Sequence, residues 1–83
     1  MATGTDTAKI TSLTTDAQGV HITSDVPDAE GQPTRYIILL ADPGREALLD
    51  AALDAEQHGK TVALKYETPS YNGVEFRLLS ITT

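Results

Sequence analysis

The amino-acid sequence predicts a small, mainly β protein in which five strands close into a barrel and one helix lies between the third and fourth strands. Three observations support this prediction. The chain has 83 residues and no cysteine, which suits one domain without disulfides. Segments that alternate apolar and polar residues, as strands do, occupy both halves of the chain. Only residues 42–59 carry signals for both the start and the end of a helix.

The beginning of the chain predicts a flexible tail followed by a strand. Residues 1–7 are small and polar and show no periodicity, so we expect a tail there and a single folded domain over residues 8–83. Residues 9–15 are rich in β-branched side chains, which favour strands. Their two large apolar residues share one face only if the strand contains a bulge near Ser12.

Four further strands follow from alternation and turn signals. An Asp–Ala–Gln–Gly turn ends the first strand, and an Asn72–Gly73 pair, typical of tight hairpins, precedes the last. The third strand is apolar on both faces, as a central strand is. In the last strand the apolar residues lie on one face up to Leu78 and on the other face from Leu79 onward. This change of face predicts a second bulge. The four segments are residues 20–26, 35–41, 60–67 and 74–82.

The helix is expected over about residues 43–58. Asp42 can cap its first amides, Pro43 suits the first helical position, and Gly59 can adopt the left-handed conformation that ends a helix. Strand, strand, strand, helix, strand, strand is the order of the OB-fold, a five-stranded Greek-key barrel with one helix at its end. A split sheet packed on one helix is the alternative arrangement.

A helical wheel divides the predicted helix into three faces. A bulky apolar face is expected to pack on the barrel, a flank of small residues to approach another copy of the chain, and an acidic stripe to face water. The plainer explanation of the flank is that alanine is the best helix former. These faces are, in turn, Leu48, Leu49, Ala52 and Leu53; Ala47, Ala51 and Ala55; and Glu46, Asp50, Asp54 and Gln57.

Composition argues against several classes of function. The net charge of −6 argues against nucleic-acid binding, since that affinity rests on clustered cations. No apolar stretch is long enough for membrane insertion. The first nine residues lack both the basic and the apolar region of a signal peptide, so none is expected in this chain.

No catalytic residue, metal site or cofactor is expected. His21 and His58 match no metal-ligand spacing, and we expect them to occupy surface or capping positions. Glu46, Asp50 and Asp54 lie along a helix and do not converge from a loop as calcium ligands do. The serines show no nucleophile elbow. The sequence therefore predicts a protein that is not an enzyme.

A sugar-binding site is the hypothesis that the last loop supports best. Tyr71 can stack on the apolar face of a sugar ring, and Ser70 and Asn72 can bond its hydroxyls. A carboxylate on the sugar can pair with Arg77 or Arg35. The alternative is an exposed turn that contains a tyrosine by chance.

The second half of the chain resembles the B subunits of pertussis-like bacterial toxins and their small relatives. The matching segments are an apolar strand that runs into the helix, a leucine- and alanine-rich helix, the helix end with the following strand, and the closing strand. In sequence they are RYIILLAD, EALLDAALDA, HGKTVALKYE and VEFRLLSIT.

This resemblance implies an OB-fold that forms a ring of five copies, with the helices around a central pore and glycan binding on the outer surface. It also implies a secreted or periplasmic protein and a catalytic A-type partner. The alanine flank would then form the subunit interface, and the acidic stripe would line the pore. The alternative function is a monomeric or dimeric OB-fold adaptor that binds a protein or single-stranded nucleic acid.

Overall fold

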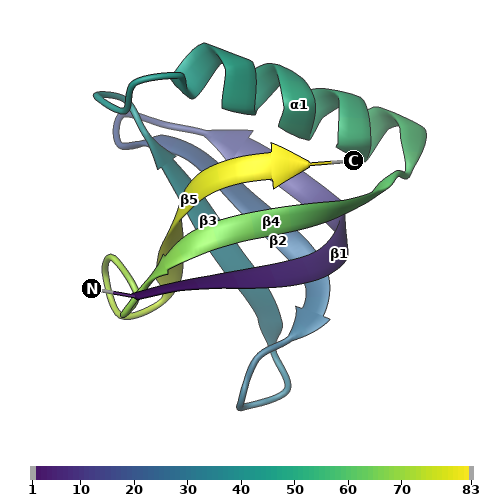
Figure 1. The fold of residues 1–83 in the computed structure, drawn as a ribbon, viewed down its shortest axis with the longest axis vertical. Coiled ribbons are helices and arrows are strands. Elements are labelled where there is room, and N and C mark those ends of the chain that lie inside the picture. The colour runs from purple at the N-terminus through teal and green to yellow at the C-terminus, as the bar shows by residue number, and fades with distance from the viewer. Residues whose placement is uncertain (1, 83) are drawn as a thin grey trace.

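A computed structural model describes residues 2–82, and within them the chain forms five strands and one helix in the predicted order (Figure 1). The elements are β1 (Ala2–Thr15), β2 (Gly19–Pro27), β3 (Pro33–Leu39), α1 (Arg45–His58), β4 (Thr61–Thr68) and β5 (Glu75–Thr82).

The strands close into a barrel with the neighbour order β1-β2-β3-β5-β4, and β4 pairs back onto β1. Every pairing is antiparallel except that of β3 with β5, which is parallel. This topology confirms the predicted OB-fold. Figure 1 shows α1 lying across one end of the barrel, with the β2–β3 loop at the opposite end.

The start of β1 corrects the predicted tail. Residues 2–7 pair with β4 over their whole length and therefore belong to the barrel. Gly4 and Asp6 are half-buried on the inner face, where the Tyr66 ring leaves no room for a Cβ on Gly4. The apolar periodicity that identifies a strand is missing because glycine and a carboxylate occupy the inward positions. Met1 lies outside the described residues.

Both predicted bulges are confirmed. The register of β1 against β2 shifts between Ile10 and Ser12. Along β5 the partner of Lys65 is Ser80 and the partner of Tyr66 is Leu78, which leaves Leu79 as the extra residue. Bulges increase the coiling of a strand, and this coiling allows five short strands to close into a barrel.

The helix ends as predicted but begins differently. Gly59 adopts the left-handed conformation, and its N–H donates to the Ala55 carbonyl. At the start the cap position is taken by Gly44, with φ of 77° and no side-chain cap. The Arg45 amide donates to the Asp42 carbonyl, so Pro43 and Gly44 form the centre of a type II turn that leads into the helix. The predicted cap at Asp42 is wrong because its carboxylate bonds elsewhere.

The faces of α1 differ from the wheel at two positions. Ala52 and Ala55 are the buried residues, with Leu48 and Leu49 packed against the same core. Leu53, predicted to pack on the barrel, is 39% exposed. Ala55, predicted to face another copy, is 1% exposed within a single chain. The helix lies on the barrel through its small residues because they let its backbone come close to the strands.

The barrel interior is apolar in the middle and aromatic towards the open end. Tyr36 is fully buried, and its hydroxyl donates to the Asp6 carboxylate at 2.6 Å. The Tyr66 ring lies 5.7 Å from that of Tyr36 and 4.9 Å from that of Phe76, centroid to centroid. Ile37 points to the opposite side of β3 and is also fully buried, so the prediction of a strand buried on both faces is confirmed.

Candidate functional site

The outer surface of β2, β3 and β5 carries two rows of side chains that point away from the core. Alternate residues of a strand share a face, and Ile22, Tyr36 and Leu78 point inward. The outward residues of neighbouring strands therefore meet in register. The rows are Thr23, Arg35 and Glu75, and His21, Ile37 and Arg77.

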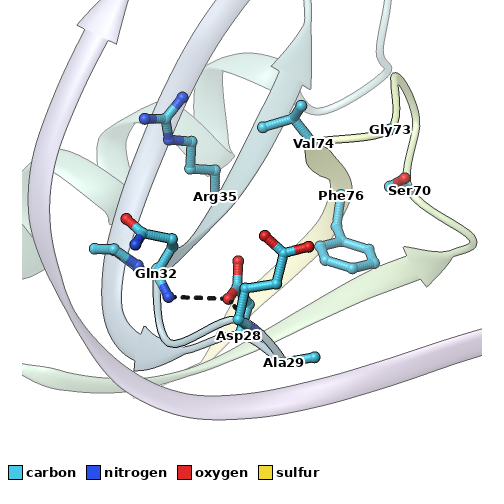
Figure 2. A pocket seen from close by; sticks show the side chains of 10 residues that line it. Asp28, Ala29, Gln32, Arg35, Ser70, Gly73, Val74 and Phe76 are labelled. Carbon is cyan, nitrogen blue, oxygen red and sulfur yellow. Dashed lines mark hydrogen bonds between the residues drawn. The ribbon is translucent and has the colours of Figure 1, made fainter.

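A first cleft, of about 450 Å³, lies between the β2–β3 loop and the β4–β5 loop. We call it the loop cleft. Figure 2 shows Asp28 and Gln32 on one loop, Ser70, Gly73 and Val74 on the other, and the Phe76 ring between the two. The lining includes two carboxylates, one cation, one hydroxyl and two larger apolar side chains, namely Asp28, Glu30, Arg35, Ser70, Val74 and Phe76.

A second cleft, of about 470 Å³, lies along the outer face of β2, and we call it the strand cleft. Its polar lining includes Ser12, Thr14, Asp16, His21, Arg35 and Glu75. Arg35 lines both clefts. The two clefts therefore adjoin at this residue.

Asp28 shapes the wall of the loop cleft that the β2–β3 loop supplies. Its carboxylate accepts from the amides of Glu30 at 2.8 Å and Gln32 at 3.0 Å. The Asp28 amide donates to the Gln32 carbonyl at 2.7 Å. The loop is closed by its own hydrogen bonds, so the Asp28 side chain has a defined position at the edge of the cleft.

The β4–β5 loop is wider than the tight hairpin that Asn72–Gly73 predicts. β4 and β5 pair antiparallel as expected, but six residues separate them. Only Gly73 has a positive φ, of 83°, whereas the predicted turn needs two such residues. The side-chain oxygen of Asn72, Oδ1, accepts from the amides of Val74 and Glu75, so the side chain of Asn72 holds the loop together.

Two of the predicted sugar-binding residues therefore have other partners. Asn72 donates from its amide group to Glu75 at 2.8 Å. Arg77 donates to Asp42 at 2.5 and 3.2 Å and to Glu67 at 3.4 Å. The hydrogen bond to Asp42 raises the pKa of Arg77 above its ordinary value. These contacts join β5 to the turn before α1 and make Arg77 a structural residue.

The other two predicted residues remain accessible. Ser70 lines the loop cleft. Tyr71 is 55% exposed and stands beside Ser70 on the same loop, although it is not part of the cleft lining. Arg35, the second arginine that the sequence offers for a carboxylate, is exposed at the point where the two clefts meet.

His21 joins three elements at the far end of the strand cleft. Its Nδ1 lies 2.5 Å from a Glu75 oxygen and its Nε2 lies 2.8 Å from an Asp16 oxygen. The hydrogen bond to Glu75, followed by that to Asp16, raises the pKa of His21 above its ordinary value of 6.5. His21 in turn holds the pKa of Asp16 below 3.8, with help from the Gln18 amide.

Sequence reasoning missed the roles of Glu75, Asp16 and Phe76 in this surface. Alternation places Glu75 on the outer face of the last strand. That it lies beside His21, however, depends on the parallel pairing of β3 with β5, across 54 residues of chain. No spacing in the sequence encodes that pairing.

The predicted interface and pore residues lie on the helix, away from these clefts. Ala47 is exposed and Ala51 half-buried, while Glu46 and Asp50 are exposed. Asp54 bonds Lys60 at 2.6 Å and His58 at 3.0 Å. The acidic stripe is thus partly neutralised at the helix end.

Comparison with known proteins returned no family: the chain matches no protein-family model and no curated protein sequence. Within residues 2–82, no cluster of three or more His, Asp or Glu side chains is arranged to hold a metal ion. In the same range no helix is long and apolar enough to cross a membrane.

Proposed function

We propose that this protein is a non-enzymatic OB-fold domain that binds a glycan on the outer face of β2 and β3. One observation carries the proposal: the two clefts adjoin at Arg35, and each is lined by side chains that can bond sugar hydroxyls. OB-folds commonly bind oligosaccharides and oligonucleotides on this face and its bordering loops.

The lining of this surface suits a sugar. Hydroxyls from Ser12, Thr14 and Ser70 and carboxylates from Asp28 and Glu30 offer donors and acceptors for sugar hydroxyls. Phe76 at the loop cleft and Tyr71 beside it supply aromatic surface for the apolar side of a ring.

Arg35 favours a glycan with a carboxylate group. No carboxylate of residues 2–82 lies within ion-pair distance of Arg35, whereas Arg77 is paired twice. An arginine fork binds a carboxylate through two parallel hydrogen bonds. Arg35 therefore takes the role that the sequence left open between two arginines.

Nucleic acid suits the surface less well. A strand-binding groove needs several cations along the backbone of the ligand. Here Arg35 and His21 face four carboxylates from Asp16, Asp28, Glu30 and Glu75. The four carboxylates would repel a polyphosphate, whereas Arg35 can still bond a single carboxylate.

The proposal includes assembly into a ring of five copies, as the toxin B subunits that the chain resembles form. Ala47 and Leu53 are both exposed and lie on either side of Asp50 on α1. In a ring every contact is heterologous, so one flank of a helix meets the opposite flank of the next. Such a ring would turn Glu46 and Asp50 towards its axis.

The remaining parts of the proposal rest on the resemblance alone. A toxin-like B ring works outside the cytoplasm, so we propose a secreted or periplasmic location. It also carries a catalytic A-type subunit, and an acidic pore would attract a basic segment of such a partner.

A glycan array tests the binding proposal. We expect the wild-type protein to bind glycans with a terminal carboxylate and to lose at least tenfold in affinity with Arg35→Ala. The matched control is Lys65→Ala, which removes an exposed cation from β4 and should leave binding unchanged. Binding to single-stranded oligonucleotides, or glycan binding that is indifferent to Arg35, would overturn the proposal.

The solution mass tests the assembly. Size-exclusion chromatography with light scattering should give a mass near five times the 8.8 kDa of one chain. A monomeric mass would refute the ring and favour the adaptor function.

A further inference from the structure

A chain of hydrogen bonds crosses the outer face and links two segments that border the proposed site. Asp16, in the β1–β2 turn, bonds His21, and His21 bonds Glu75 at the start of β5. Glu75 uses its other oxygen to accept from Asn72, which holds the β4–β5 loop. The turn and the loop are therefore connected through one imidazole ring.

The protonation state of His21 decides whether this connection is complete. Both ring nitrogens face carboxylate oxygens, at 2.5 and 2.8 Å. A protonated imidazole donates from both nitrogens, whereas a neutral ring has one N–H and one acceptor lone pair. A neutral His21 would thus turn a lone pair towards one carboxylate, which is repulsive.

The structure indicates which of the two contacts opens. The Glu75 side chain is 10% exposed and the Asp16 side chain is 54% exposed. Leaving a buried carboxylate without a donor costs more than returning an exposed one to water. The neutral ring should therefore keep its bond to Glu75, and Asp16 should separate from it.

Charged and uncharged side chains from three strands surround His21. β1 contributes the uncharged Thr14, and β3 contributes Ile37 with Arg35 two residues earlier. β5 contributes Glu75 and, beyond Ile37, Arg77, whose charge is paired with Asp42. In the strand cleft two carboxylates thus balance His21 and Arg35, and deprotonation of His21 leaves a net negative charge.

We propose that His21 is a pH-sensitive clasp that joins the Asp16 carboxylate of the β1–β2 turn to the start of β5, and that loss of its proton frees this carboxylate and widens the strand cleft. The two carboxylate partners raise the pKa of His21, so this release is expected above the ordinary value of 6.5. Since the clasp borders the site proposed above, its opening should weaken binding of a ligand with a carboxylate.

The clasp is tested first on the protein without ligand, by NMR titration from pH 5 to pH 10. The His21 ring resonance, assigned by its absence in His21→Gln, should titrate with a midpoint above 6.5. The amides of Gln18 and Gly19, which donate to Asp16, should shift with the same midpoint. In Asp16→Asn the His21 midpoint should fall and the turn amides should stop following it.

Either of two results would overturn the clasp: a His21 midpoint at or below 6.5, or turn amides that do not titrate together with His21. Asp16→Asn changes only an exposed group, so it keeps the test valid if His21→Gln does not fold. A second measurement compares the affinity for an array-identified acidic glycan on either side of the midpoint, where we expect at least a threefold loss at high pH. Failure to find a glycan would leave the NMR result standing, so the two proposals fail separately.

Discussion

The Tyr36 hydroxyl donates to the Asp6 carboxylate at 2.6 Å and so links β3 with the first half of β1, thirty residues away. Burial, together with the Asp6 carboxylate, raises the pKa of Tyr36. The same carboxylate contributes to raising the pKa of Tyr66, for which burial is again the main cause. A segment without a single large apolar residue is in this way fixed to the centre of the barrel.

Replacing Tyr36 with phenylalanine should lower the free energy of unfolding by about 1–3 kcal/mol, because a half-buried carboxylate loses a donor. Urea denaturation measures the loss. Tyr71→Phe removes a hydroxyl from an exposed ring and should change stability by less than about 0.5 kcal/mol. Equal effects of the two variants would contradict the role given to Asp6.

Gly4→Ala should destabilise the barrel, since a Cβ at this position would stand 2.7 Å from two atoms of the Tyr66 ring. Forcing extra atoms into a packed site costs about 1–3 kcal/mol. The control is Thr5→Ala, at the next, exposed position of β1. If residues 2–7 were a loose tail, both substitutions would leave the thermal midpoint unchanged.

Arg77→Ala should destabilise the fold, whereas Arg35→Ala should not. Arg77 is bonded to Asp42, whose side chain is only 8% exposed, and leaving that carboxylate unpaired costs about 1–3 kcal/mol. Arg35 lies on an exposed face, so its loss should affect ligand binding alone. Chemical denaturation of both variants decides between structural and binding roles, and the reverse ranking would reject this assignment.

Substitutions on α1 should separate assembly from folding. Ala47→Glu places a charge on an exposed flank and should convert a pentamer into monomers with an unchanged circular dichroism spectrum. Ala51→Glu should also prevent assembly, while Asp54→Ala should leave the mass unchanged. Ala55→Glu buries a charge in the core and should unfold the chain. A pentamer that survives Ala47→Glu would refute the flank as an interface.

Stability should depend on pH through His21 and Asp16 in opposite directions. The pKa of His21 is raised above 6.5 by folding, so its contribution is complete below that pH and is lost as the pH rises through the folded value. The pKa of Asp16 is held below 3.8, so its contribution is present above that pH and is lost on acidification. Thermal midpoints should therefore be highest between pH 3.8 and pH 6.5. His21→Gln should remove the decline above this range.

Much of the fold follows from the sequence alone. The alternation in β2 and β4, the continuous apolar run in β3 and the Gly59 helix end are local patterns, and each corresponds to one element of the structure. The bulges are also readable, since an apolar residue on the wrong face needs an extra residue to correct it. Local backbone preference and burial of apolar side chains suffice for these features.

Other features depend on partners that lie far away in the chain. Residues 2–7 became a strand because β4 offers them a hydrogen-bonding edge and Tyr66 fills the space above Gly4. Asp42 lost its expected cap role because Arg77, 35 residues later, binds its carboxylate. Neither effect is visible in a local window of sequence.

The sequence by itself determined the fold class, the acidic character and the accessible Tyr71 and Ser70, since these depend on composition and periodicity. Only the tertiary structure decided which arginine faces the clefts and which carboxylates surround His21. The parallel pairing of β3 with β5 sets both outcomes. Its register brings Glu75 beside Arg35 and Arg77 beside Ile37, and a register between distant strands is fixed by how the whole barrel closes.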